Sequence, residues 1–244
     1  MGEPHGSPTS PFLLRRSPNE SILASRPAKP GSGHIALPHG STEDRTHSDG
    51  GTVLERWLDS VVATPGLTAL RDPVDARRVL LDDSLRGVPL VEREDGPIVD
   101  VGSGGGTPGI PLAASLPGRE VTLLEAERRK CDFLERWTPE LPNLRVVWGR
   151  AEEQPLETYG VAVAKALAHP PTAVEWCLPL VREGGVVVLW VGPSLDEERA
   201  ATAASRIAGR LEPAPAGFLV VRKTGPTPPG FPRRTGVARK RPLA

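Results

Sequence analysis

The residues of this chain best suited to chemistry are glycines, gathered where a predicted strand meets a predicted helix. From Ile98 to Ser115 the sequence reads IVDVGSGGGTPGIPLAAS, with five glycines between Gly102 and Gly109. At such a junction the free N–H groups of the helix point at any ligand, and glycine permits both a positive φ and close approach to the backbone. The stretch therefore predicts a loop that binds a ligand through its main chain.

Two glycine spacings overlap in this loop. Asp100, Gly102, Gly104 and Gly106 form D-x-G-x-G-x-G, which is typical of class I methyltransferases. Gly104, Gly106 and Gly109 also satisfy G-x-G-x-x-G, the dinucleotide fingerprint. A third interpretation is a structural glycine turn without any ligand. The loop alone does not choose among the three.

Two acidic residues narrow the choice. Glu125 ends the next predicted strand, 21 residues after Gly104, where an acid accepts hydrogen bonds from a ribose diol. This role fits S-adenosylmethionine and a nicotinamide dinucleotide equally well. Asp100 favours the first ligand, because its carboxylate suits an ammonium group and would repel a pyrophosphate. We therefore expect S-adenosylmethionine.

The elements around the loop indicate a doubly wound α/β fold. Short apolar runs alternate with helical patterns, which is typical of a parallel sheet covered on both faces. Helices are predicted over Thr172–Arg182 and Leu195–Gly209, and Gly217–Arg222 is predicted to enter the sheet as a hairpin partner. The five apolar runs are Ile98–Val101, Val121–Leu124, Val146–Trp148, Val161–Ala164 and Val186–Val191.

The chain before the loop divides into two parts. Residues 1–50 are rich in Pro, Gly, Ser, His and Arg and lack periodicity, which predicts disorder. Residues 51–94 are predicted to form a small helical cap. Its first helix has an apolar stripe around Trp57, and its second begins at Pro73 with Asp72 as N-cap. A methyltransferase domain over 95–223 and a basic tail over 224–244 would follow.

Composition excludes several classes of protein. The chain of 244 residues is 38% hydrophobic, enough for a core, and has no apolar run of membrane-spanning length or signal-peptide pattern. Cys131 and Cys177 lack metal-ligand spacing. We expect a cytoplasmic monomer with no membrane contact and no metal. The net charge is zero, yet residues 222–244 hold seven cations and no acid, which predicts a basic, RNA-contacting tail.

Beyond the loop, the sequence resembles the small-subunit ribosomal RNA methyltransferase G family, also called glucose-inhibited division protein B. A weaker likeness covers the predicted cap, LTALRDPVDARRVLLDDSL (67–85). The main matching segments are DVGSGGGTPGIPLA (100–113), VTLLEAERRKCDFLE (121–135), GRAEE (149–153), CLPLVREGG (177–185) and FPRRTGVARKRPL (231–243).

The resemblance implies both a fold and a reaction. It implies a class I, Rossmann-like S-adenosylmethionine-dependent methyltransferase with a mostly parallel seven-stranded sheet and a small N-terminal helical cap. Members of the family methylate N7 of a guanine in 16S ribosomal RNA, so the implied partner is that RNA or the small ribosomal subunit. Together with the loop pattern, the resemblance gives these cofactor-binding residues: Asp100, Gly102, Gly104, Thr107, Glu125, Ala151, Glu152 and Lys165. The RNA-binding residues are Arg233, Arg234, Arg239, Lys240 and Arg241.

Departures from the family pattern concentrate on the substrate side. Lys165 replaces the usual arginine of an S-R-A motif, Val79 a histidine and Val191 a lysine, and an extra acid stands at Asp82-Asp83. Lys165 remains the candidate catalytic residue, directed at a phosphate, the cofactor carboxylate or guanine O6, or else a lysine that only reaches solvent from a strand end. Two alternatives stay open: a degenerate paralogue that binds S-adenosylmethionine or rRNA without turnover, and a nicotinamide-dependent oxidoreductase.

Overall fold

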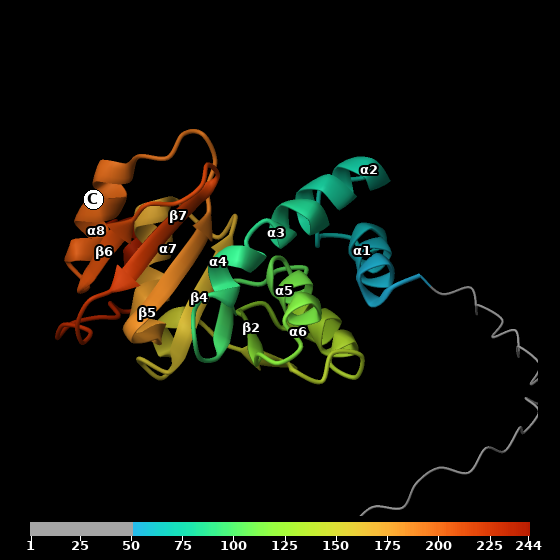
Figure 1. Ribbon diagram of the computed structural model, residues 1–244, viewed down its shortest axis with the longest axis horizontal. Helices are drawn as coiled ribbons and strands as arrows, with labels where there is room; N and C mark the ends of the chain where they lie inside the picture. The colour runs from blue at the N-terminus through green and yellow to red at the C-terminus, as the bar shows by residue number, and fades with distance from the viewer. Residues whose placement is uncertain (1–50) are drawn as a thin grey trace, which may run out of the picture. The chain divides into compact units, whose positions relative to one another are not determined.

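The computed structural model of the chain describes residues 51–244 (Figure 1). All of them belong to one compact unit. The prediction that residues 1–50 are disordered lies outside the described residues. Within the described part of the chain, no helix is long and apolar enough to span a membrane.

One seven-stranded sheet organises the molecule, in the order β3-β2-β1-β4-β5-β7-β6. The first five strands pair in parallel, whereas β7 lies antiparallel to β5 and β6. Since the strand order reverses between β1 and β4, ligands are expected at the carboxyl ends of the strands there. The strands are β1 (Ile98–Val101), β2 (Val121–Glu125), β3 (Leu144–Trp148), β4 (Tyr159–Lys165), β5 (Val181–Trp190), β6 (Gly209–Glu212) and β7 (Phe218–Lys223). The predicted doubly wound, mostly parallel seven-stranded sheet is confirmed.

Helices cover both faces of this sheet, because successive strand residues point to opposite sides. Ile98 packs with residues of α1, α5 and α6, while its neighbour Val99 packs with residues of α7 and α8. The helices after the cap are α5 (Gly109–Ser115), α6 (Arg128–Leu134), α7 (Pro170–Cys177), α8 (Glu197–Ser205) and α9 (Val237–Lys240), with 3₁₀ turns η2 (Glu135–Trp137), η3 (Ala151–Glu153) and η4 (Leu178–Leu180).

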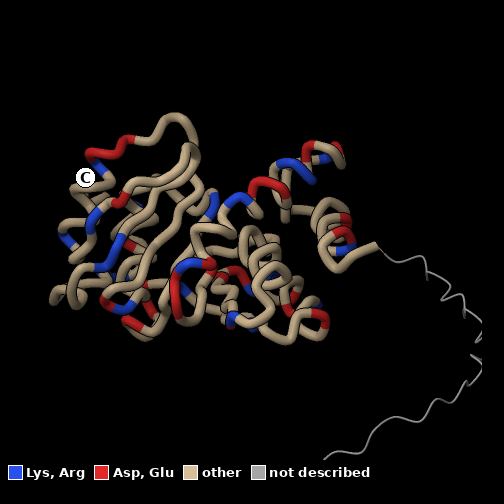
Figure 2. The backbone as a smooth tube through the Cα atoms, viewed as in Figure 1, with Lys and Arg blue, Asp and Glu red and all other residues tan. Residues whose placement is uncertain are grey.

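The cap is helical, as the sequence predicts. Its elements are α1 (Val53–Ala63), α2 (Pro73–Ala76), η1 (Arg77–Asp82), α3 (Asp83–Leu85) and α4 (Val88–Glu92). Thr52 and Glu55 form a capping box at the start of α1, and the Asp72 side chain accepts from Asp75 N at 2.9 Å. Trp57 is fully buried on the predicted apolar stripe. Figure 2 shows acidic and basic positions alternating along α2, η1 and α3.

The structure corrects two predicted helix ends and adds one feature. Helix α7 ends at Cys177 and β5 begins at Val181, because Pro179 has no N–H to continue the helix. Helix α8 ends at Ser205, and the residues near Gly209, predicted to be helical, begin β6 instead. The turn η1 is a π-helix, which holds one more residue per turn than its α-helical neighbours.

Candidate active site

A cavity of about 550 Å³ lies at the carboxyl ends of β1, β2, β3 and β4, and we call it the cofactor cavity. Leu67 and Leu80 of the cap, Trp176 of α7 and Arg239 of α9 also line it. The structure thus brings together seven of the eight predicted cofactor residues: Gly102, Gly104, Thr107, Glu125, Ala151, Glu152 and Lys165. Asp100 is the exception.

The glycine loop presents bare main chain to this cavity. Gly102 and Gly104 have φ values of +73° and +57°, in the left-handed region that favours glycine. A Cβ on Gly102 would lie 2.4 Å from Leu167 Cδ1, whereas one on Gly104 would meet only Gly102 O, at 3.9 Å. The loop therefore leaves room for a ligand against its main chain at Gly104.

Glu125 joins the end of β2 to this loop. One carboxylate oxygen accepts from Gly104 N at 2.9 Å and the other from Glu127 N at 2.8 Å, and the residue is 7% exposed. The carboxylate lines the cofactor cavity. It is therefore already oriented at the edge of the loop, where the sequence predicts a contact with a ribose diol.

Asp100 lies beneath the loop rather than at the cavity wall. It is fully buried, and its Oδ2 accepts from Gly109 N at 3.0 Å at the start of α5. Burial raises the pKa of Asp100 to about 7, against the lowering effects of the Gly109 N–H and Ser103 and with a smaller raising effect of Glu125. Among the described residues, its Oδ1 has no hydrogen-bond partner. Asp100 thus supports the glycine loop from beneath, whereas the sequence predicts that its carboxylate contacts the ligand.

The cap reaches the same loop through Trp57. Its indole Nε1 donates to Gly105 O at 2.8 Å, and Val61 Cγ1 would lie 3.2 Å from a Cβ on Gly105. The sequence pattern marks Trp57 only as a core residue. The signal that was available is chemical, because a buried tryptophan N–H usually needs an acceptor.

Glu152 forms the wall of the cavity beyond β3. Its Oε1 accepts from Trp176 Nε1 at 3.1 Å and from Gly236 N at 3.2 Å. Ala151, 7% exposed, lies beside it in η3. The carboxylate is therefore held from two directions, by α7 and by the segment before α9.

Lys165 lies at the end of β4 and is paired with the cap. Its Nζ lies 2.8 Å from Asp83 Oδ2, donates to Val79 O, and has a side chain that is 11% exposed. Asp83 Oδ1 accepts from Arg86 Nη1 at 2.8 Å. Although it lines the cofactor cavity, the Lys165 ammonium is thus paired with Asp83, one of the two adjacent acids at Asp82-Asp83.

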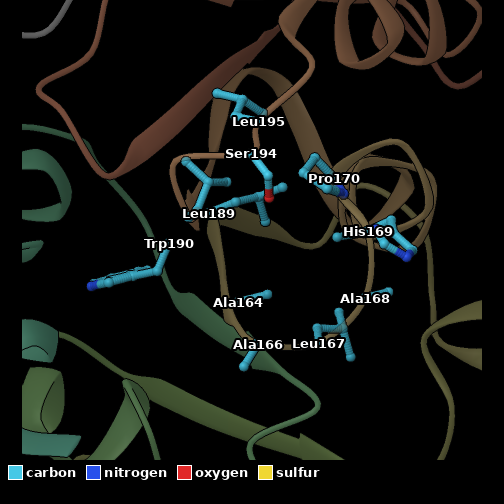
Figure 3. Close-up of a pocket in the computed structure, with 13 residues that line it drawn as sticks. Ala164, Ala166, Leu167, Ala168, His169, Pro170, Leu189, Trp190, Ser194 and Leu195 are labelled. Atoms are coloured by element: carbon cyan, nitrogen blue, oxygen red, sulfur yellow. The ribbon is translucent and has the colours of Figure 1, made fainter. Parts of the chain in front are cut away.

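A second pocket of about 190 Å³ adjoins the cofactor cavity, and we call it the side pocket (Figure 3). The two share Ala166 and Leu167, which follow Lys165. Ala166 has a φ of +54°, a strained conformation for a residue with a Cβ. His169 and Ser194 give the side pocket polar atoms, and Figure 3 shows the Trp190 indole directed away from the other labelled side chains. That indole donates to Asp83 O at 2.8 Å.

The predicted RNA-binding residues occupy different environments. Arg233 pairs with Glu175 of α7, and Arg239 lines the cofactor cavity. Arg234, Arg239, Lys240 and Arg241 are exposed. Among residues 51–244, no cluster of His, Cys, Asp or Glu side chains is arranged to hold a metal ion.

The fold and the cofactor cavity define the class of protein. A glycine loop at the switch point of the sheet and an acid at the end of the next strand are the site of a class I S-adenosylmethionine-dependent methyltransferase. The open space at Gly104 and the oriented Glu125 carboxylate fit that cofactor. The sequence pattern of the family "rRNA small subunit methyltransferase G" matches residues 55–215.

Relatives support the same assignment. Ribosomal RNA small subunit methyltransferase G of Symbiobacterium thermophilum is 36% identical, covering 72% of this chain and 82% of the relative. Its counterpart in Thermotoga neapolitana is 37% identical, covering 77% and 89%. That of Pelotomaculum thermopropionicum is 38% identical, covering 66% and 76%. The chain belongs to the rRNA small subunit methyltransferase G family. The expected S-adenosylmethionine-dependent methylation of ribosomal RNA is thereby confirmed.

Proposed function

We propose that this chain transfers a methyl group from S-adenosylmethionine to N7 of a guanine in 16S ribosomal RNA. The observation that carries the proposal is the cofactor cavity, where seven residues from four strand ends meet. The identity of the RNA substrate in this proposal is inferred from membership of the family. We further propose that the chain acts as a monomer in the cytoplasm.

Different residues of the cavity would contact different parts of the cofactor. The glycine loop lets the cofactor approach its bare main chain, although most N–H groups from Gly102 to Thr107 already donate within the protein. Glu125 accepts from the ribose hydroxyls. Ala151 and Glu152 stand at the adenine end. Lys165, on the opposite side of β1, stands at the methionine end, facing the cofactor carboxylate or an RNA phosphate. Asp100 contributes from below, by fixing Gly109 and so the start of α5.

The transfer itself requires alignment rather than a general base. When bound, S-adenosylmethionine supplies an electrophilic methyl group on a sulfonium. Guanine N7 has an in-plane lone pair and no proton, so the N–C bond forms as the C–S bond breaks and its electron pair passes to sulfur. The residues around the cavity need only hold nucleophile, methyl and sulfur in line. Lys165 would not stabilise the positive charge gained by the base, so its role is to position.

The RNA side is assigned to two regions. We propose that the target base enters the side pocket, which adjoins the cofactor cavity at Ala166 and Leu167 and offers the polar atoms of His169 and Ser194. The exposed Arg234, Lys240 and Arg241 would contact phosphates, which orients RNA without reading its sequence.

Incubation of the purified chain with labelled S-adenosylmethionine and unmethylated small ribosomal subunits tests the activity. We expect label in 16S rRNA, located at a guanine N7. Binding without transfer would favour the degenerate paralogue, and thermal protection by NADH but not by S-adenosylhomocysteine would favour the oxidoreductase.

A matched pair of variants tests the cofactor site. Glu125→Ala should weaken S-adenosylhomocysteine binding about 10- to 100-fold, since it removes a charged acceptor. Glu120→Ala is the control, because Glu120 is exposed and precedes the opposite end of the same strand. Equal affinities of the two variants would contradict the site.

A further inference from the structure

The C-terminal segment, defined here as residues 231–241, is folded against the domain. Phe231 packs on the core, Ala238 of α9 is buried, and its carbonyl accepts from Thr172 Oγ1 of α7 at 3.4 Å. The sequence predicts an extended basic tail for RNA here. These contacts instead give the segment one defined position on α7.

A buried acid fixes that position. Arg233 Nε and Nη2 each lie 2.5 Å from an oxygen of Glu175, which is only 1% exposed. Arg233 Nη2 also donates to Arg241 O at 2.8 Å, which closes the segment into a loop. A bidentate arginine–carboxylate pair fixes the orientation of both side chains more than a single hydrogen bond does. Arg233 is thus occupied inside the protein.

The fixed segment contributes to the cofactor cavity. Gly236 N donates to Glu152, and Thr235 Oγ1 donates to Glu153 at 3.1 Å. Arg239, one turn further on, lines the cavity with Glu152 and Trp176. This wall follows β3, whereas Lys165 ends β4, so Arg239 and Lys165 lie on opposite sides of β2 and β1.

We propose that the C-terminal segment is the adenosine-side wall of the S-adenosylmethionine site. Arg239 contacts the adenosine half of the cofactor, where a guanidinium can lie over the adenine or donate to it. Arg233 is the positioning residue that holds the segment. The proposal rests on the assignment of the cofactor cavity under the proposed function.

Calorimetric titration with two ligands tests this wall. S-adenosylhomocysteine and 5′-methylthioadenosine share the adenosine half, but the second lacks the amino-acid half. Arg239→Ala should weaken both about tenfold and by the same factor. Arg234→Ala is the matched control, an exposed arginine of the same segment outside the cavity, and should change neither more than about twofold.

Glu125→Ala distinguishes a failure of the proposed wall from a failure of the cofactor site itself. If Glu125→Ala weakens both ligands while Arg239→Ala binds them as wild type does, the wall is wrong and the cofactor site stands. Weakening of S-adenosylhomocysteine alone by Arg239→Ala would also overturn the proposal, because the contact would then be with the amino-acid half. If Glu125→Ala also has no effect, the cofactor assignment itself fails.

Discussion

The two sides of the cofactor cavity are built from different groups. On the side of β1 and β2, the wall consists of glycine main chain and of the Glu125 carboxylate, which accepts from Gly104 N. On the side of β4 and the cap, it depends on an ion pair between Lys165 and Asp83. The first is a backbone conformation, and the second is a set of side-chain contacts.

This difference determines how far each side can vary in sequence. A loop with φ above zero tolerates almost no side chain, so it requires glycine. A side-chain network can be rebuilt with other partners. Val79 and Lys165, which the resemblance marks as departures from the family pattern, belong to such a network, because Lys165 donates to the Val79 carbonyl oxygen.

The largest effect is expected when a side chain is added to the glycine loop, because it disturbs the backbone that lines the cofactor cavity. Gly102→Val would place a branched Cβ at a φ of +73° and against Leu167, so we expect about a 100-fold loss of S-adenosylhomocysteine affinity and a matching loss of methylation. Gly118→Val is the control, since a Cβ there meets nothing within 4 Å. Calorimetry measures both, and equal affinities would contradict the prediction.

The buried Asp100 carboxyl beneath the glycine loop should make the free energy of unfolding depend on pH. The pKa of Asp100 is about 7 in the folded protein and 3.8 in its ordinary state, so between these values the folded state binds more protons than the unfolded state. The free energy of unfolding should therefore fall as pH rises from 4 to 7, by about 2–4 kcal/mol. Asp100→Asn keeps an acceptor for Gly109 and should remove that slope. Denaturant unfolding at several pH values measures it, and parallel profiles would refute it.

The side-chain network should be broken by a smaller change. Asp83→Asn leaves the Lys165 ammonium without its carboxylate and should lower the free energy of unfolding by about 1–2 kcal/mol. Asp82→Asn is the matched control, because Asp82 is exposed and its arginine lies 3.8 Å away. A stability change that is equal in the two variants would show that the pair contributes nothing.

The hydrogen bond between Trp57 of the cap and the glycine loop should have the smallest effect on the free energy of unfolding. Trp57→Phe removes the donor to Gly105 O and should lower the free energy of unfolding by about 1 kcal/mol. Trp148→Phe removes a similar bond to Ala126 O, but at a residue that is 60% exposed, where water can replace it. Thermal unfolding compares the two. An equal loss in both would mean that burial of the Trp57 bond has no influence.

Local patterns were enough to predict the sheet, the cap and most of the cavity wall. The glycines and the N-cap at Asp72 are recognisable because each depends on residues close in sequence. Glu125 is recognisable because it ends the strand that follows the glycine loop and its helix. The position of Asp100 was not predictable in the same way. Adjacency to the loop places its carboxylate near the ligand in sequence, but strand alternation turns it under α5.

Contacts between distant residues account for the features that the sequence did not predict. Arg233 resembles any cation of a basic tail until Glu175, far back in the chain, is seen to bury its carboxylate against it. The pairing of Lys165 with Asp83 is of the same kind. The roles of the remaining tail cations in RNA binding stay predictions.

The π-helical turn η1 determines how the cap would respond to a change in chain length. Because this turn holds one more residue than an α-helical turn, removal of one residue between Arg77 and Asp82 with rewinding as α-helix would leave the rotation of α3 relative to α2 nearly unchanged. Asp83 would then still face Lys165. Removal of a second residue would rotate α3 by about 100° and leave the Lys165 charge facing an incoming RNA without its carboxylate.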